Sequence, residues 1–400
     1  MKKQTNITIK PARLSGRVAA IPSKSYAQRI LVAAALSDQP TEILLDCRSL
    51  ANDIRATLAA LESMGASITV KADRIIVRPV RLPSTQEHFI SCGESGTTAR
   101  LLLPILCTLF DQGTLTGEGS LLARPFAALC QALEAGGVNF DNCNLPISWE
   151  GYLQATDFQL PGDESSQYVS GLLYALPLLP ADSTIALTSP LQSAGYVDIT
   201  LDVLRQFDIT IECPEPNHYH IPGNQRYVSP ETTVVEGDWS NSAFWLAAGV
   251  EVTGLESQSL QRDKVFAAVK DQPEIDVSNI PDLVPILSIC AALRTGTTRI
   301  YNIKRLRRKE SDRIATIRAM LHALGCSAQA SDDALLIHGT GEIRGGIVDG
   351  ANDHRIVMAA AIAASSAQDA VTITGADAVA KTYPHFFEDY RRLGGHIAVK

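Results

Sequence analysis

The chain has 400 residues, is 46% hydrophobic and carries a formal net charge of −8. A chain of this length and composition can bury a sizeable core and is expected to form about two domains. The acidic balance argues against a protein that coats nucleic acids or membrane surfaces, because those functions need a broad positive field.

The cysteines and the N-terminal segment bear on the compartment. The eight cysteines are scattered, without a C-x-x-C pair or a zinc-like spacing to histidine, so we expect reduced thiols. The opening segment "MKKQTNITIKPARLSG" contains no apolar run long enough for a signal sequence, and no later stretch of about 18 apolar residues predicts a membrane helix. We therefore expect a cytoplasmic protein.

One type of segment recurs along the chain: a small polar cluster that opens an Ala/Leu-rich helix. The six cases are 23–36, 94–106, 165–179, 240–250, 281–293 and 352–364. Their first polar residues follow one another at about 71 to 75 residues, except for one interval of about 42 between the fourth and the fifth. A fixed period of this kind predicts an internal repeat.

The segments between these helices predict strands. They alternate or are rich in β-branched residues, and Gly, Pro and Asn separate them, as at 67–80, 183–189, 208–215 and 276–280. Each repeat therefore predicts a β/α module.

The helix starts combine capping residues with cations and polar side chains. Ser, Asp and Asn at a helix start are good N-caps, and capping alone is one interpretation of each start. Helix N-termini also attract anions, and added Lys or Arg favours phosphate or carboxylate binding. The residues of this kind are Lys24, Arg29, Arg100, Gln167, Asp282, His354 and Arg355.

A basic run, "RLRRKESDRIATI" at 305–317, predicts a loop that enters an amphipathic helix. Its apolar side is expected to comprise Ile314, Ile317, Met320 and Leu321. One interpretation is a solvated face with ion pairs, Glu310 with Arg313 and Asp312 with Arg308. The other is an anion site.

Seven motifs occur in order: "IPSKSYAQR", "CGESGTTAR", "LLARPF", "SSQYVSGLL", "RRKESDRI", "NDHRIVMA" and "AVAKTYPHFFEDY". Together they strongly resemble the 5-enolpyruvylshikimate-3-phosphate synthase family (3-phosphoshikimate 1-carboxyvinyltransferases). Each motif alone is short and common, whereas seven in order across the chain are specific.

The resemblance implies an α/β fold with two similar domains. Each would contain three βαβαββ units in an inside-out, barrel-like arrangement, with helix N-termini facing the interdomain cleft. The first domain, 22–235, would make most contacts to shikimate 3-phosphate, and the second would combine 1–21 with 236–400. Closure would bring Lys24 and Arg124 against Arg313, Arg355 and Lys381 and exclude water from the reaction.

The resemblance also implies the activity. Members transfer the enolpyruvyl group of phosphoenolpyruvate to the 5-hydroxyl of shikimate 3-phosphate and release phosphate, through a tetrahedral intermediate, in the biosynthesis of chorismate and aromatic amino acids. By motif match, Asp282 would take the hydroxyl proton, although a helix N-cap is its simpler interpretation. Glu310 would protonate the methylene carbon and take the proton back, and Lys24 would assist the leaving phosphate.

The same match assigns binding residues. Those for shikimate 3-phosphate are Lys24, Ser25, Arg29, Ser165, Ser166, Gln167, Ser193, Tyr196, Asp282 and Lys309. Those for phosphoenolpyruvate are Lys24, Gly96, Arg124, Gln167, Arg313, Arg355 and Lys381. No metal or organic cofactor is implied, the expected partners are these two small molecules, and the family resemblance suggests a monomer.

One residue departs from the family pattern, and three arginines of the basic run lie outside it. Glu94 stands in "CGESGTTAR" where many members have Asn, and a carboxylate there would repel phosphoenolpyruvate unless it turns away or pairs. Gly96 is kept, which predicts sensitivity to glyphosate. The resemblance assigns no role to Arg305, Arg307 and Arg308.

Three alternatives remain open. The sister transferase that acts on UDP-N-acetylglucosamine has a Cys or Asp in the loop before its arginine, and here "GEGSLLARPF" contains neither. A non-catalytic binder of phosphate ligands would use the same helix starts without Asp282 or Glu310. An RNA-processing enzyme on a related repeat is disfavoured by the net charge of −8.

Overall fold

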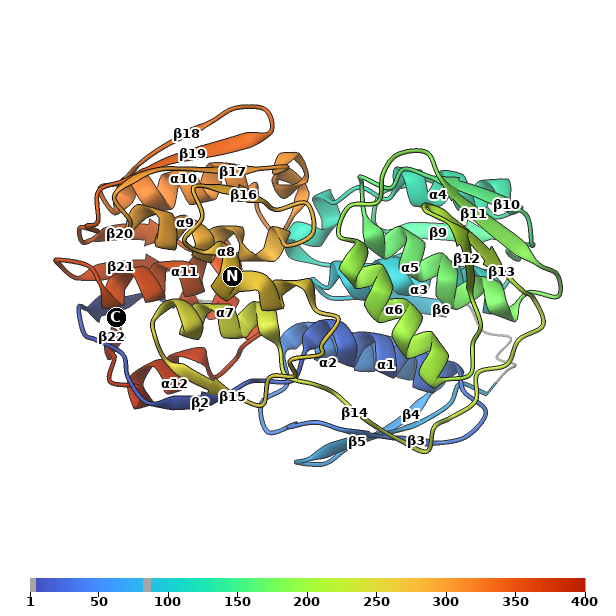
Figure 1. The fold of residues 1–400 in the computed structure, drawn as a ribbon. Coiled ribbons are helices and arrows are strands. Elements are labelled where there is room, and N and C mark those ends of the chain that lie inside the picture. Colours follow the sequence, from blue (N-terminus) through green and yellow to red (C-terminus); the bar gives the residue numbers. More distant parts are fainter. Residues whose placement is uncertain (1–4, 82–87, 400) are drawn as a thin grey trace. The chain divides into compact units, whose positions relative to one another are not determined.

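A computed structural model describes residues 5–81 and 88–399 of the chain. The chain divides into two compact units, a first unit of residues 22–235 and a second unit of residues 1–21 with 236–400 (Figure 1). The chain therefore passes from one unit to the other twice, near residues 21 and 236. Residues 1–4, 82–87 and 400 lie within these bounds but outside the described part.

The first unit alternates strands and helices. Its helices are α1 (Lys24–Leu36), α2 (Asn52–Ser63), α3 (Gly96–Leu109), α4 (Ala127–Ala135), α5 (Ser166–Ala175) and α6 (Ala194–Gln206), with 3-10 turns η1 (Gly119–Ala123) and η2 (Leu176–Leu178). Its strands are β3 (Thr41–Leu44), β4 (Ser67–Val70), β5 (Arg74–Arg78), β6 (His88–Ser91), β7 (Gln112–Thr116), β8 (Asn139–Phe140), β9 (Ile147–Glu150), β10 (Asp157–Leu160), β11 (Ser183–Leu187), β12 (Glu212–Glu215), β13 (His218–Ile221) and β14 (Thr232–Val234).

The second unit has the same kind of elements. Its helices are α7 (Trp239–Ala247), α8 (Phe266–Val269), α9 (Val284–Ala292), α10 (Arg313–Ala323), α11 (His354–Ser365) and α12 (Phe386–Arg392), with 3-10 turns η3 (Arg262–Val265), η4 (Pro281–Leu283), η5 (Lys304–Arg308) and η6 (Ala376–Lys381). Its strands are β1 (Ile7–Lys10), β2 (Arg17–Ala19), β15 (Glu251–Thr253), β16 (Glu274–Asp276), β17 (Gly296–Tyr301), β18 (Ser327–Ala330), β19 (Ala334–Gly339), β20 (Gly346–Asp349), β21 (Val371–Thr374) and β22 (His396–Val399).

Within the described residues, five sheets have four strands and one has two. In the order β6-β7-β9-β8, β6 and β7 are parallel and joined by α3, whereas β9 is antiparallel to both β7 and β8. The orders β10-β11-β13-β12 and β16-β17-β19-β18 repeat this arrangement. A helix crossover followed by a hairpin is what the predicted βαβαββ unit requires.

The short interval between the fourth and fifth helix starts has a structural cause. After α7, the chain forms β15, η3 and α8 and then enters β16, without the closing hairpin that follows the second helix of other copies. Strand β15 pairs only with β2 among the named strands, in the two-stranded sheet. The second unit thus contains two complete copies and a shortened one, where the resemblance implied three complete copies.

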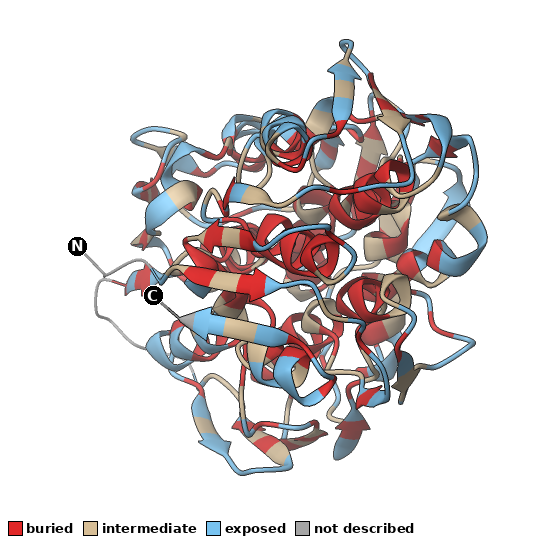
Figure 2. Cartoon of the chain, turned by 90° about the vertical axis from the view of Figure 1, so that its left-hand side faces the viewer, coloured by how far each residue is buried: buried red, intermediate tan, exposed pale blue. Residues whose placement is uncertain are grey.

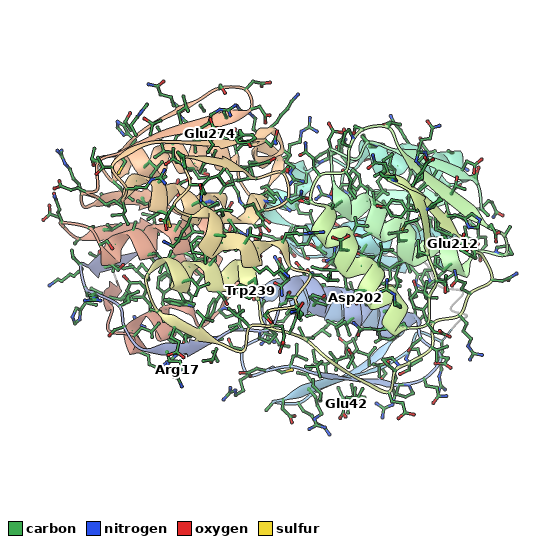
Figure 3. All side chains as sticks on the ribbon, viewed as in Figure 1. Arg17, Glu42, Asp202, Glu212, Trp239 and Glu274 are labelled. Atoms are coloured by element: carbon green, nitrogen blue, oxygen red, sulfur yellow. The ribbon has the colours of Figure 1, made fainter. Side chains whose placement is uncertain are left out.

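The recurring helices form the interior of each unit. Nearly every residue of α1, α3, α5, α9 and α11 is buried, and Figure 2 shows helices of this kind in red, with pale blue strands outside. Charged side chains such as Glu42, Glu212 and Glu274 lie on outer strands (Figure 3). A helix that is apolar all round is stable only when it is enclosed, which explains the Ala/Leu-rich composition of these segments.

Close approach of α3 and α5 depends on a glycine. A Cβ at Gly171 would lie 2.4 Å from the carbonyl oxygen of Arg100 and 3.1 Å from Pro104 Cγ. The backbones can therefore approach here only because Gly171 has no side chain. This contact brings the start of α5 beside the start of α3.

Some predicted boundaries were wrong. The strand predicted at 208–215 forms only over Glu212–Glu215. The strand predicted at 276–280 lies earlier in the chain, because β16 covers Glu274–Asp276 and ends where the predicted segment begins. The segments at 67–80 and 183–189 do contain β4, β5 and β11.

Candidate active site

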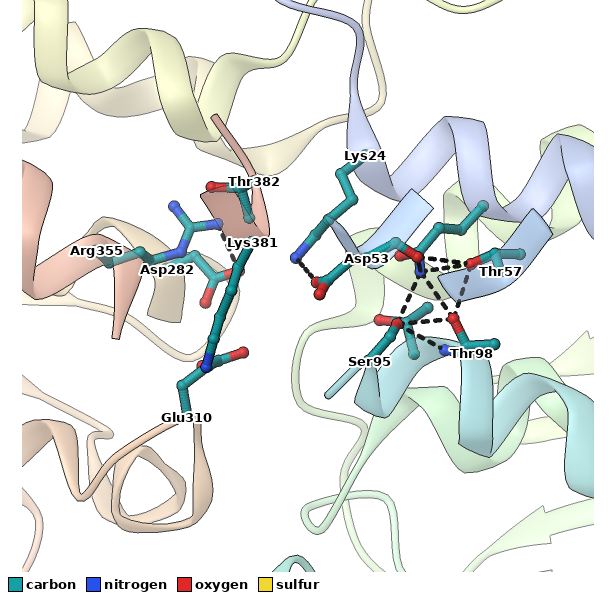
Figure 4. A network of polar contacts seen from close by, with 12 residues as sticks. Lys24, Asp53, Thr57, Ser95, Thr98, Asp282, Glu310, Arg355, Lys381 and Thr382 are labelled. Atoms are coloured by element: carbon teal, nitrogen blue, oxygen red, sulfur yellow. Dashed lines mark hydrogen bonds and ion pairs between the residues drawn. The ribbon is translucent and has the colours of Figure 1, made fainter. Parts of the chain in front are cut away.

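In the first unit, an ion pair joins the starts of two helices. Lys24 is the first residue of α1, and Asp53 lies in the first turn of α2. Their Nζ and Oδ2 atoms are 2.8 Å apart, and both side chains are largely buried (Figure 4). The pair holds the ammonium group of Lys24 at the N-terminal end of α1.

The start of α3 lies against two arginines. Gly96 is the first residue of α3, and a Cβ on it would lie 2.7 Å from Arg124 NH1 and 3.5 Å from Arg100 NH1. Arg124 and Arg100 are both buried. Two guanidinium groups beside a helix N-terminus form a strongly anion-attracting environment.

Gln167 connects this region to α5. Its Oε1 accepts from Arg100 NH1 at 2.9 Å, and its Nε2 donates to Thr97 Oγ1 at 2.8 Å. Ser165 caps α5 by accepting from the backbone N–H of Gln167, and Ser166 is the first helical residue. The structure therefore brings the predicted residues of α3 and α5 together.

The remaining predicted residues of this unit lie around Arg29. Its Nε donates to Thr200 Oγ1 at 2.8 Å, its NH1 donates to the carbonyl of Ser25 at 3.0 Å, and its guanidinium lies 5.8 Å from the ring centre of Tyr196. Burial lowers the pKa of Arg29 from its ordinary value. Ser193, with φ of 56°, directly precedes α6 without a side-chain capping bond, and Tyr196 and Thr200 lie on this helix.

In the second unit, three carboxylates surround one guanidinium. Arg313, only 1% exposed, lies 2.7 Å from Asp282 Oδ1 through NH1, 2.6 Å from Glu310 Oε2 through NH2, and 2.8 Å from Asp353 Oδ2 through Nε. Burial opposes the charge of Arg313, but these carboxylates outweigh it and hold the pKa well above its ordinary value. Both predicted proton-transfer carboxylates therefore bind the same side chain.

Asp282 also binds two further cations. Its Oδ2 lies 3.1 Å from Arg355 NH2, and its Oδ1 lies 3.6 Å from Lys309 Nζ. Burial raises the pKa of Asp282, but Arg355, Lys309 and Arg313 outweigh burial and hold it well below the usual range. The carboxyl group is therefore ionised at neutral pH.

Lys309 and Lys381 are the other two predicted binding cations of this unit. Burial lowers the pKa of Lys309 to about 8, although Asp282 opposes this shift. Lys381 ends η6 and donates from Nζ to the carbonyl of Asn352 at 2.8 Å, just before α11. Arg355 is the second residue of α11, which Asp353 caps.

The structure corrects the simpler interpretation of Asp282 as a helix N-cap. Asp282 lies inside η4, and Leu283 precedes α9 without a side-chain capping bond. Two predicted helix starts were also wrong by one or two residues. The capping residue of α3 is Ser95 and not Glu94, and that of α7 is Asp238 and not Ser240.

The basic run contains both surface and site residues. The predicted apolar side of α10 is buried, and Glu310 pairs with Arg313 as the solvated-face interpretation expected. Asp312 caps α10 and lies 3.6 Å from exposed Arg307, rather than forming the expected pair with Arg308. Arg305 donates to the carbonyl of Ser278.

Two carboxylates of the site were not singled out from the sequence. The only sequence signal for Asp53 is an acid in the first turn of "NDIRATL", a helix start outside the six recurring segments. Asp263 is buried, accepts from Ser240 Oγ, and has its pKa raised to about 7, first by burial and then by Asp282. Its partner Ser240 lies on α7, so no local motif signals the contact.

The departure at Glu94 has a defined position. A Cβ on Gly119 would lie 2.5 Å from the carboxyl carbon of Glu94, and Gly119 has φ of +56°. The Glu94 carboxylate thus packs against η1, the turn that leads to Arg124. Here glycine both permits the backbone conformation and makes room for the acid.

The described part of the chain contains neither a candidate metal cluster nor a candidate membrane-spanning helix. Across residues 5–81 and 88–399, no group of three or more His, Cys, Asp or Glu side chains is arranged to hold a metal ion. No helix in these ranges has the length and apolar character needed to cross a membrane.

Comparison with known proteins covers nearly the whole chain. The family model described as EPSP synthase (3-phosphoshikimate 1-carboxyvinyltransferase) matches residues 9–390. Proteins named 3-phosphoshikimate 1-carboxyvinyltransferase from Clostridium acetobutylicum and Clostridium kluyveri are 38% and 37% identical, each alignment covering 98% of both chains.

A solved structure supports the fold. The EPSP synthase from Acinetobacter baumannii has a TM-score of 0.82 at 23% identity, with 99% of this chain and 100% of that chain covered. The fold is therefore that of the two-domain enolpyruvyl transferases. Since the family model and the relatives both span almost the full length, the chain belongs to the EPSP synthase family.

Proposed function

We propose that this chain is a 3-phosphoshikimate 1-carboxyvinyltransferase, which transfers the enolpyruvyl group of phosphoenolpyruvate to the 5-hydroxyl of shikimate 3-phosphate and releases phosphate. Family membership supports the proposal. The structural observation that carries it is the attachment of Asp282 and Glu310 to the same buried guanidinium, that of Arg313. Two carboxylates beside cations supply proton transfer and anion binding together.

The reaction balances as an addition followed by an elimination. The 5-hydroxyl oxygen bonds to C2 of phosphoenolpyruvate, the hydroxyl proton leaves, and the methylene carbon accepts a proton to become a methyl group. In the second step the methyl group loses a proton, the bond from C2 to the phosphate oxygen breaks, and phosphate departs. The enzyme needs a base, an acid and cations that stabilise the phosphate.

We assign substrate binding in the first unit by the cations and helix starts. Shikimate 3-phosphate would be held by Ser25, Arg29, Ser165, Ser166, Ser193 and Tyr196. Phosphoenolpyruvate would be held by the backbone at Gly96 and by Arg124 and Gln167, with Lys24 contacting both substrates and assisting the leaving phosphate. The two buried arginines beside the start of α3 support the phosphoenolpyruvate assignment.

In the second unit, Arg313, Arg355 and Lys381 would bind phosphoenolpyruvate, and Lys309 and Asp282 would contact shikimate 3-phosphate. Asp282 is a poor base while three cations hold its pKa low, because a general base works best with a pKa near the working pH. Anionic substrate groups would compete with Asp282 for Arg313 and Arg355. Their binding would therefore raise the basicity of Asp282 when the hydroxyl is in place.

Glu310 would protonate the methylene carbon and then remove the proton in the elimination step. Its side chain pairs with Arg313 NH2 at 2.6 Å and is 18% exposed, so it is less enclosed than Arg313 itself. A partly accessible carboxyl group suits a residue that must reach a substrate carbon.

The test is phosphate release from phosphoenolpyruvate, with shikimate 3-phosphate or UDP-N-acetylglucosamine as acceptor. We expect release only with shikimate 3-phosphate. Asp282→Asn and Glu310→Gln should each lower kcat by about 10²- to 10⁴-fold, the usual contribution of a proton-transfer residue. Glu342→Gln is the matched control, because Glu342 is exposed and is none of the residues assigned to substrate binding or proton transfer.

Other outcomes identify the alternatives. Release only with the nucleotide sugar would place the activity in the sister transferase class, and binding without release would indicate a non-catalytic phosphate binder. We further propose a cytoplasmic monomer with no nucleic-acid partner, inhibited by glyphosate competitively with phosphoenolpyruvate because Gly96 is present.

A further inference from the structure

One buried amide contacts the starts of two helices besides its own. Gln28 is 0% exposed and lies one turn after Lys24, on the same face of α1. Its Nε2 lies 3.3 Å from the carbonyl of Asp53 and 3.0 Å from Thr57 Oγ1, both on α2.

The same nitrogen also reaches the start of α3. It lies 3.0 Å from Ser95 Oγ and 3.2 Å from Thr98 Oγ1. Ser95 caps α3, and Thr57 and Thr98 contact each other at 2.7 Å (Figure 4). Four oxygens from α2 and α3 therefore surround one amide nitrogen of α1.

Packing alone does not explain a glutamine at this buried position. The Oε1 atom of Gln28 is buried without a hydrogen-bond partner among the described residues. An unpaired buried acceptor is unfavourable, and such a group in a folded protein calls for an explanation other than stability. An apolar side chain of similar size would avoid this penalty but would lose all four contacts.

The groups that Gln28 contacts belong to the site. The backbone carbonyl of Asp53 belongs to the residue that pairs with Lys24, and Ser95 precedes Gly96, beside which Arg124 lies. A shift of the amide would therefore change the position of the Lys24–Asp53 pair relative to the start of α3.

We propose that Gln28 is a positioning residue for enolpyruvyl transfer, which fixes the Lys24–Asp53 pair relative to the N-terminus of α3. This inference rests on the proposed function. It acts mainly on the phosphoenolpyruvate side of the site: Lys24 also contacts shikimate 3-phosphate, but Arg29, which binds only that substrate, is anchored separately by Thr200 on α6. Loss of the amide should therefore affect the two substrates unequally.

The experiment replaces Gln28 with Leu, which keeps the approximate volume and removes the amide. We expect the KM for phosphoenolpyruvate to rise about tenfold and kcat to fall about tenfold or more, since small displacements of reacting groups are costly. The Kd of shikimate 3-phosphate alone, measured by calorimetry, should rise by a smaller factor, about threefold or less, because Lys24 is only one of its contacts.

Gln225→Leu is the matched control. Gln225 is a structural amide of the same unit, with Nε2 bonds of 2.9 Å to the carbonyl of Thr210 and 2.7 Å to that of Pro222. Its loss should lower the melting temperature without changing KM or kcat. If Gln28→Leu behaves like this control, the positioning role is overturned.

A second variant protects the test against misfolding. Thr57→Val deletes one of the four oxygens with little change in shape, and it should move KM and kcat in the same direction as Gln28→Leu by a smaller factor. Unchanged constants in both variants would contradict the inference. Absence of turnover in the unmodified protein would instead contradict the proposed function.

Discussion

At the residue scale, the charge of each site carboxyl group is decided by competition between burial and cations. Asp282 and Asp263 show the two outcomes, and the charge of Asp282 itself raises the pKa of Asp263. For Asp282, Arg355, Lys309 and Arg313 outweigh burial, so the group is ionised. For Asp263, burial and the Asp282 charge prevail over Ser240 and Arg355, so the pKa is raised to about 7.

The raised pKa of Asp263 predicts a pH-dependent stability. The folded state binds this proton more tightly than an unfolded chain, whose Asp pKa is about 4, so stability is lost as the pH rises from about 4 to about 7. Asp263→Asn removes the ionisation. Its effect on the free energy of unfolding should therefore be more favourable at pH 8 than at pH 5, by about 2 to 3 kcal/mol.

Thermal unfolding at the two pH values measures this difference. Asp332→Asn, at an exposed position, is the control for the substitution itself. An Asp263→Asn effect that is equal at both pH values would show that the buried carboxyl group does not titrate in this range.

A site residue could be predicted from the sequence when it stands in a short motif, and it could not when its role depends on contacts with distant parts of the chain. The motifs singled out Lys24, Asp282 and Glu310 because each stands in a recognisable short stretch. Asp53 and Gln28 were missed, since their contacts join separate helices and only the folded packing brings them together.

At the scale of elements, the contact of α3 with α5 determines where Gln167 lies. Gly171→Ala would place a Cβ 2.4 Å from a backbone oxygen, which cannot move without separating the helices. Alanine normally stabilises a helix by up to about 1 kcal/mol relative to glycine. Here we expect a loss of about 1 to 3 kcal/mol, as in overpacked cores.

Urea unfolding followed by circular dichroism checks this expectation. The variant should also bind phosphoenolpyruvate more weakly, because separation of α3 and α5 disturbs the bonds from Gln167 to Arg100 and Thr97. A variant that is more stable than the unmodified protein would contradict the proposed packing.

The interior helices could be predicted from their apolar composition, because a helix that is apolar on all sides is stable only when it is buried. The capping residues were predicted one or two positions too early or too late, at Glu94 and Ser240. Several polar residues stand in a row at these helix starts, and each of them can act as the cap. The position of Asp282 in η4 could not be predicted, because a 3-10 turn before α9 has no distinctive sequence pattern.

At the scale of the whole molecule, a chain with net charge −8 gathers cations in two sets, one in each unit. In the second unit, internal carboxylates neutralise much of that charge, as around Arg313. The repeat predicted the β/α architecture. The repeat could not predict that the hairpin after α8 is missing, because the sequence showed only that the fourth and fifth recurring helix starts lie closer together than the others.

Taken together, the fold, the site and the relatives indicate that the chain moves an enolpyruvyl group by addition and elimination. Proton NMR of the reaction in ²H₂O tests it most directly. We expect a new vinyl ether product, one phosphate released per product, and deuterium in the methylene group of the product, since the methyl group of the intermediate gains deuterium from the acid. Phosphate release without a vinyl product, or a product without deuterium, would rule out addition followed by elimination.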